Sequence, residues 1–114
     1  MTRVYKILAA ADWAKAEAEG RYEGSALDLR DGFIHLSTAA QAGETARLYF
    51  SGIEGLSIVS FDADRLGPDL KWEPSRGGEL FPHLFRAIDP SEAVECRPLP
   101  LNADGWPDPG PLEP

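Results

Sequence analysis

The stretch Asp31-Gly32-Phe33-Ile34-His35-Leu36-Ser37-Thr38-Ala39-Ala40-Gln41 predicts a turn, a short strand and the start of a helix. It opens with a turn dipeptide, and the alternation from Phe33 to Ser37 directs aliphatic side chains to one face of a strand and His35 to the other. Thr38 followed by Gln41 has the spacing of a capping box, so a helix should begin directly after the strand. The stretch therefore places a histidine close to a helix N-terminus.

This placement has a chemical consequence. The first turn of a helix offers unpaired N–H groups and the positive end of the helix dipole, which favour an anion such as a phosphate. A neutral imidazole beside it can donate or accept a hydrogen bond. A purely structural role is more frequent for a lone strand histidine: Thr38 caps the helix, Ser37 faces solvent and His35 is hydrogen-bonded in a half-buried strand.

Length and composition limit the classes of protein. The 114 residues predict one domain with a modest core. Cys96 is the single cysteine, which favours a reducing compartment and excludes a disulfide framework. No segment has the features of a signal peptide or the ~20 apolar residues of a membrane span, so we expect a cytoplasmic protein.

Charge limits the classes of partner. The sequence has 11 Lys and Arg against 19 Asp and Glu, a formal net charge of −8. An acidic chain repels nucleic-acid backbones and anionic membranes, so we expect no bulk nucleic-acid partner and no membrane partner. A few arginines can still form a local site for a small nucleotide-like anion. The oligomeric state is not encoded in any pattern that we recognise.

The order of elements predicts a single α+β domain. Helices are expected at 13–19, capped by Asp12, and at 39–50. Residues 21–30 should be a loop leading into the turn at 31–32. Strands are expected at 4–9, 33–37, 55–62, 70–73, 80–88 and 92–101, with 55–62 central and Pro82 at an edge, a strand start or a bulge. We assign 1–101 to the domain and 102–114 to an extended or disordered proline-rich tail that Trp106 could pin to the body.

Common catalytic motifs are absent from the sequence. There is no Gly-x-x-x-x-Gly-Lys loop, Gly-x-Gly-x-x-Gly, Gly-x-Ser-x-Gly elbow or paired-cysteine site. His35 and His83 could meet beside a carboxylate to bind a metal, but their spacing imposes no such geometry, and no metal is expected. Ser37 with a histidine likewise does not indicate a hydrolase.

A second stretch, 72–85, resembles the first in carrying a histidine beside aromatic residues. Two glycines before His83 would let a ligand approach the backbone, and Arg76 is a planar donor suited to phosphate or carboxylate. One interpretation is a site shared with the first stretch. The other is structural: the aromatic residues form core and Glu73 is a solvated partner of Arg76.

The words "YKI", "DGFIHLST" and "KWEPSRGGELFPHLF" resemble a small bacterial and plant family catalogued as domain of unknown function 952. The resemblance reaches from the first strand to about Val94. The family is grouped with ADP-ribosyltransferases and RNA 2′-phosphotransferases, which implies an ADP-ribosyltransferase-like, split or strongly bent mixed sheet with two main helices. It also implies a cleft for NAD or a related ADP-ribose compound.

The resemblance implies particular roles. His35 would hold a ribose, His83 would enter from the other sheet, and Arg76 or the helix start at Thr38 would meet the pyrophosphate. Transferases of the superfamily commonly use a late glutamate, and this chain departs there, so Glu73 or Glu79 would have to serve as the catalytic carboxylate. The expected cofactor-binding residues are His35, Ser37, Thr38, Arg76 and His83.

Three functional hypotheses follow. The first is an ADP-ribosyltransferase-like protein, or a phosphoryl transferase, with a cleft between 33–38 and 73–85. The second is a non-catalytic small-ligand or protein-interaction module that keeps the cleft. The third, least supported, is a metal hydrolase that uses the two histidines.

Overall fold

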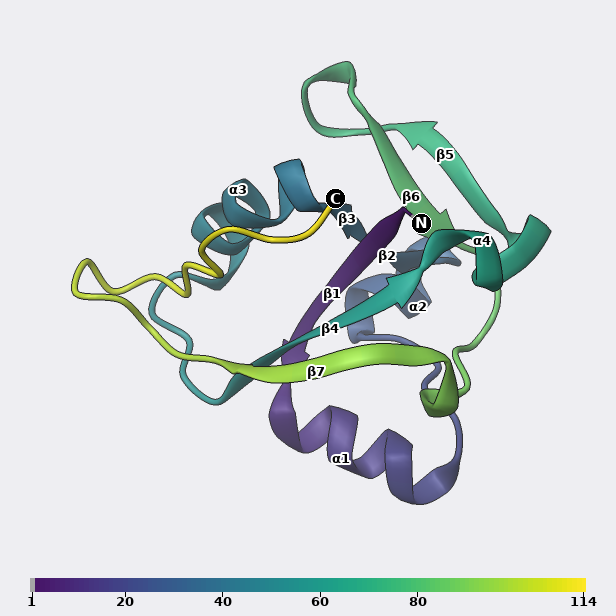
Figure 1. Cartoon of the computed structure of the whole chain (residues 1–114), viewed down its shortest axis with the longest axis horizontal. Helices are drawn as coiled ribbons and strands as arrows, with labels where there is room; N and C mark the ends of the chain where they lie inside the picture. Colours follow the sequence, from purple (N-terminus) through teal and green to yellow (C-terminus); the bar gives the residue numbers. More distant parts are fainter. Residues whose placement is uncertain (1) are drawn as a thin grey trace.

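The computed structural model describes residues 2–114 and contains two antiparallel sheets. The larger sheet has the strand order β3-β1-β4-β7, with β3 at Ser37–Thr38, β1 at Arg3–Ala9, β4 at Leu56–Asp62 and β7 at Ala93–Leu99. The smaller sheet has the order β2-β6-β5, with β2 at Ile34–His35, β6 at Leu80–Leu84 and β5 at Leu70–Pro74. Figure 1 shows β5 and β6 as a hairpin that projects beyond the larger sheet. The expected α+β class with a divided sheet is confirmed. The expected mixed pairing is wrong, because the paired strands of residues 2–114 run antiparallel.

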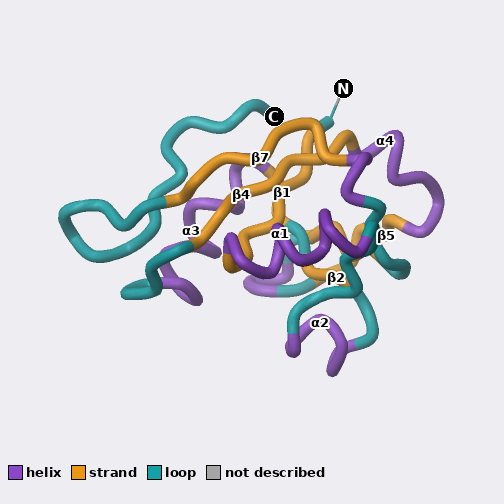
Figure 2. Tube along the Cα trace, turned by 90° about the horizontal axis from the view of Figure 1, so that it is seen from below, coloured by secondary structure: helices purple, strands orange, loops and turns teal. Residues whose placement is uncertain are grey.

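Two long helices cover the larger sheet. Helix α1 (Ala10–Glu19) lies against β1 and β4, and α3 (Ala39–Phe50) packs against β1 (Figure 2). Two shorter helices are α2 (Ala26–Asp31) and α4 (Ala63–Leu66), and 3₁₀ turns occupy Gly67–Asp69, Arg76–Gly78 and Pro90–Glu92. No helix among residues 2–114 is long and apolar enough to cross a bilayer.

The alternation of strand side chains builds a core on each face of the larger sheet. One cluster joins Val4 and Phe61 to Trp13 of α1 and to Leu84 of the smaller sheet. The other joins alternate strand positions to Ala42 and Ala46 of α3 and to the C-terminal segment. Strand β4 lies between β1 and β7, and its side chains reach both clusters, so its predicted central position is confirmed.

The capping residues predicted from the sequence are confirmed for one helix and wrong for another. In α3 the Gln41 N donates to Thr38 Oγ1 at 3.2 Å and the Thr38 N donates to Gln41 Oε1 at 3.1 Å, so the predicted capping box is confirmed. The predicted Asp12 cap of α1 is wrong: β1 runs directly into α1, Ala9 is the capping residue and Asp12 lies in the first turn. The predicted loop at 21–30 contains α2, which Ser25 caps.

The single strand expected at 33–37 is wrong. The chain changes sheet at Leu36, because His35 pairs with His83 of β6 whereas Thr38 pairs with Val4 of β1. Pro82 lies inside the central strand β6, not at an edge. Its carbonyl accepts from Leu36 N at 3.0 Å, just past the end of β2, so the missing proline N–H faces away from the β5 ladder.

The segment 102–114 has no helix or strand but follows the body of the domain (Figure 1). Trp106 and Leu112 pack against the cluster beneath α3. Arg97 Nη2 donates to the Pro109 carbonyl at 3.1 Å, and the Tyr5 hydroxyl donates to the Glu113 carbonyl. The C-terminal half of this proline-rich segment is therefore hydrogen-bonded to the domain at Pro109 and Glu113.

Candidate functional site

His35 is held by two acidic side chains from the helix that precedes it. Its Nδ1 lies 2.7 Å from Asp28 Oδ1, and its Nε2 lies 3.0 Å from Asp31 Oδ2. Both aspartates belong to α2, which turns back at Gly32 into β2. A neutral imidazole has one N–H and a protonated one has two, so the imidazolium form is the one that can donate to both carboxylates.

Asp28 is the centre of this network. Its side chain is only 1% exposed and lies 2.7 Å from the Nζ of Lys6, a β1 side chain that is 8% exposed. It also accepts from the backbone N–H of Ser25 at 2.8 Å and of His35 at 3.1 Å. Lys6 Nζ donates in addition to the His35 carbonyl at 3.1 Å. One carboxylate thus caps α2, pairs with a buried ammonium and orients His35.

The ionisation of this buried pair reflects both burial and attraction. Burial alone would raise the pKa of Asp28, but the Lys6 ammonium and the backbone N–H donors outweigh it and hold that pKa below its usual value. Burial lowers the pKa of Lys6, and Asp28 opposes this shift. Asp28 therefore stays a carboxylate in the folded protein at neutral pH.

His83 lies beside His35 on the neighbouring strand. The two residues are register partners of β2 and β6, and their ring centroids are 5.6 Å apart. Phe33 stacks on His83 with centroids 4.1 Å apart and contacts His35 with centroids 4.6 Å apart. His83 Nδ1 lies 2.8 Å from Glu73 Oε1 of β5. The structure therefore brings His35 and His83 together on the Phe33 ring, with Glu73 bonded to His83.

The cleft expected between 33–38 and 73–85 is closed where the two stretches pair, and only their residues Phe33, Ile34, Leu84 and Phe85 line a hollow. Residues 34–35 and 83–84 form hydrogen-bonded neighbours in the smaller sheet, so no space separates them. The resemblance implied that His83 enters the cleft from the other sheet. This is wrong, because His83 lies in the same sheet as His35. The site is instead one face of the smaller sheet, which we call the histidine face. It consists of Phe33, His35, Glu73, Phe81 and His83. On it His83 and Phe81 are buried and His35 is half-buried.

Ser37 and Thr38 lie where the chain has left this sheet. Ser37 is buried, and its hydroxyl lies 3.1 Å from the Thr45 hydroxyl on α3, so the solvated Ser37 of the structural interpretation is wrong. The Thr38 hydroxyl and backbone N–H are both used in the helix cap. No hydrogen bond among residues 2–114 joins either side chain to the histidine face.

Arg76 lies at the β5–β6 turn and reaches the histidine face. Its guanidinium is 4.9 Å from the centroid of Phe81 and 6.0 Å from that of Tyr49, and it donates to the Thr45 hydroxyl at 3.2 Å. No carboxylate among residues 2–114 forms an ion pair with it, so the expected Glu73–Arg76 pair is wrong. Glu79 is exposed in the same turn, with only its backbone bonded locally.

A hollow of about 210 Å³ adjoins the histidine network. Asp28 and Phe33 line it from one side, and Phe85 and Arg86 line it from the other. Arg86 is already paired with Glu92 at 2.8 Å, which lowers the pKa of Glu92. In the part of the chain that is described, no three metal-ligating side chains converge on one position, so the metal-hydrolase hypothesis finds no support.

Sequence reasoning missed the residues that anchor the site. Lys6 appeared only as part of a strand, and Asp28 as part of a loop. A Ser25-x-x-Asp28 spacing was available as a signal, because it is a capping pattern like that of Thr38 and Gln41. Nothing in the local sequence signals the contact between Lys6 and Asp28, which forms only when β1 and α2 meet in the fold.

The fold and site define a small α+β domain in which two antiparallel sheets carry a paired-histidine face. The family described as "Protein of unknown function (DUF952)" matches residues 7–96, and the chain belongs to this family.

Two solved structures are similar to the chain over nearly its whole length. The crystal structure of protein CC0527 from Caulobacter crescentus has 53% sequence identity, covers 96% of each chain and has a TM-score of 0.93. The solution NMR structure of CC0527 has 54% identity, covers 94% of this chain and 92% of that chain, and has a TM-score of 0.85. No curated protein matches the sequence.

Proposed function

We propose that the histidine face binds a small anionic nucleotide of the NAD or ADP-ribose type. The observation that carries the proposal is the meeting of His35 and His83 on one sheet face, with the carboxylate-free Arg76 stacked on the same face at Phe81. Imidazole rings can bond ribose hydroxyls, and a planar guanidinium matches a phosphate. The proposal places the protein in the cytoplasm, because a lone, exposed Cys96 suits a reducing compartment.

Each group has a proposed role. Arg76, braced by Thr45 and Phe81, meets the pyrophosphate. His35, held at Nδ1 by Asp28, donates from Nε2 to a ribose hydroxyl that displaces the surface carboxylate of Asp31 from that nitrogen. The first turn of α3 beyond Thr38 adds a positive dipole end. The exposed ring of Tyr49, next to Arg76, offers a surface for the base.

A transfer reaction at this face needs a free carboxylate. An acceptor hydroxyl would attack ribose C1′, the bond to nicotinamide would break, and a glutamate would take the acceptor proton. Glu73 is held by His83 Nδ1, whereas the Glu79 carboxylate has no hydrogen-bond or ion-pair partner among residues 2–114. Glu79 is therefore the better candidate for this step and Glu73 the second. In a phosphoryl transfer Arg76 would bind the phosphate, as it is proposed to bind the pyrophosphate here.

A second candidate is a module that binds the nucleotide without catalysis. It is favoured by the fact that Asp28, Asp31 and Glu73 all face a histidine, so none of these carboxylates is available as a base. Nucleotide binding with no release of nicotinamide, unchanged in Glu73→Gln and Glu79→Gln, would support this candidate over the transferase.

Amide NMR titration with NAD and ADP-ribose tests the binding proposal. We expect saturable shifts at His35, His83 and Arg76 at ligand concentrations up to about millimolar. Arg76→Gln should abolish or strongly weaken these shifts, whereas Arg65→Gln, a matched exposed arginine on α4, should leave them unchanged. An absence of shifts around His35 at millimolar ligand would refute dinucleotide binding.

A further inference from the structure

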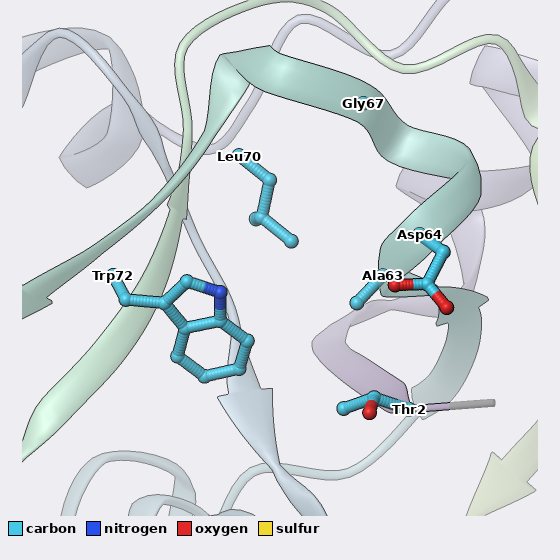
Figure 3. A pocket seen from close by; sticks show the side chains of 6 residues that line it. All are labelled: Thr2, Ala63, Asp64, Gly67, Leu70 and Trp72. Carbon is cyan, nitrogen blue, oxygen red and sulfur yellow. The ribbon is translucent and has the colours of Figure 1, made fainter.

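A second hollow lies away from the histidine face, where α4 and the following 3₁₀ turn meet the start of β5 (Figure 3). Its volume is about 340 Å³, within the range of small-molecule sites. Leu70 and Trp72 line it from β5, whereas Lys71 and Glu73 alternate to the other side of that strand. One face of β5 thus lines this hollow and the other belongs to the histidine face. The remaining lining residues are Thr2, Ala63, Asp64 and Gly67.

Trp72 forms the apolar wall of this hollow. Its side chain stands on one side with Leu70 pointing in beside it, and Ala63 faces them from α4 (Figure 3). The residue is 41% exposed, which is high for so large an apolar side chain. No aromatic ring and no arginine of residues 2–114 stacks on the Trp72 indole. A large ring surface is therefore open to a ligand.

Asp64 lies across the hollow from Trp72 (Figure 3). Its backbone N–H donates to Asp62 Oδ1 at 3.0 Å, but in residues 2–114 its own carboxylate accepts no hydrogen bond and forms no ion pair. Asp62 and Asp69 add negative charge on either side of α4 and its turn. Arg86, the nearest cation bonded to this region, is bound to Glu92 and lies 3.8 Å from Asp69. No cation of residues 2–114 therefore forms an ion pair with Asp64.

We propose that this hollow binds a small organic cation, an alkylammonium group with a short hydrocarbon body. The ammonium pairs with Asp64, and the hydrocarbon packs on Leu70 and the Trp72 ring, whose face also attracts a cation. The surrounding aspartates disfavour an anion here. The proposal is independent of nucleotide binding, because the hollow shares no lining residue with the histidine face.

The test uses n-butylammonium as the probe and butan-1-ol as its neutral match. The readout is the indole N–H resonance of Trp72, assigned by its absence in Trp72→Phe. We expect a saturable shift with n-butylammonium at concentrations on the order of 10 mM, and a clearly weaker response to butan-1-ol. No shift with n-butylammonium, or equal shifts with both probes, would overturn the proposal.

A pair of variants tests the role of Asp64. Asp64→Asn should weaken n-butylammonium binding about two- to fivefold and leave the butan-1-ol response unchanged, because it removes an exposed charge and keeps the side-chain shape. Asp104→Asn, an exposed aspartate in the C-terminal segment, should change neither response. Should Asp64→Asn fail to fold, the comparison of the two probes on the natural chain still decides.

Discussion

Replacing Asp28 by asparagine should destabilise the fold more than the loss of any other charge that contacts His35 or His83. The substitution keeps the side-chain volume but leaves the ammonium of Lys6, 8% exposed, without its counter-ion. Removing one partner of a buried ion pair costs about 3–5 kcal/mol. A domain of this size has a total stability of about 5–15 kcal/mol, so the loss is a large fraction of it. The melting temperature should fall by roughly 10–20 °C.

A double-mutant cycle separates the ion pair from the other bonds of Asp28. Lys6→Met removes the ammonium and keeps a long apolar side chain in the β1 position. The double variant Lys6→Met/Asp28→Asn should be destabilised clearly less than the sum of the two single variants, because no charge is left buried and unpaired. Urea unfolding of the four proteins measures the coupling.

Asp31→Asn is the matched control for this cycle. It removes the second acidic partner of His35, but Asp31 lies at the surface and has water as an alternative partner. Its effect on the unfolding midpoint should be small. A loss below about 1 kcal/mol in Asp28→Asn, or additive effects of Lys6→Met and Asp28→Asn, would refute a buried, coupled pair.

Three further predictions use the same fold. The pKa of Asp28 is lower in the folded than in the unfolded state, so its ionisation stabilises the fold above the unfolded-state pKa, and this stabilisation is lost as the pH falls through the folded-state pKa. The unfolding free energy, measured by urea titration at several pH values, should therefore drop below about pH 4. The drop should be less steep in Asp28→Asn. Gly24→Ala should lower the unfolding free energy by about 1–3 kcal/mol, because Gly24 has φ +119° and a Cβ there would lie 2.7 Å from Asp28 Cβ. Gly43 lies inside α3 with open space where a Cβ would be, so Gly43→Ala should leave the unfolding free energy unchanged or raise it by up to about 1 kcal/mol. Thermal unfolding measures both variants. Trp106→Ala should detach the C-terminal segment from the cluster beneath α3 and speed amide exchange in residues 102–114 without changing exchange in β4; equal protection in both proteins would contradict this contact.

The parts of the fold that local chemistry specifies could be predicted from the sequence. The capping box of Thr38 and Gln41 and the central position of β4 follow from side-chain spacing over a few residues. The crossing at Leu36 could not be predicted, because the alternation from Phe33 to Ser37 is the same whether one strand continues or two short strands join different sheets. Only the partners, β6 for His35 and β1 for Thr38, decide between them.

The candidate site also has a part that the sequence predicts and a part that it does not. The two histidines were recognised from their aromatic surroundings, and the structure shows them as register partners. Their acidic partners were not recognised, because Asp28 was assigned to a loop and Asp31 to a turn. A histidine's protonation and orientation depend on groups that the fold brings to it, and here those groups come from α2, β5 and, through Asp28, from β1.

The distribution of carboxylates narrows the choice between transfer and simple binding. His35 faces two aspartates, one of them fixed by Lys6, and His83 faces Glu73, so each ring is supplied with negative charge from within the protein. The ring nitrogens that face these carboxylates are used in contacts within the protein. A carboxylate that accepts the proton of an attacking hydroxyl would therefore have to come from outside this network. Glu79, beside Arg76 in the β5–β6 turn, meets that condition, so the activity of Glu79→Gln distinguishes a transferase from a binding module more sharply than any change at the histidines.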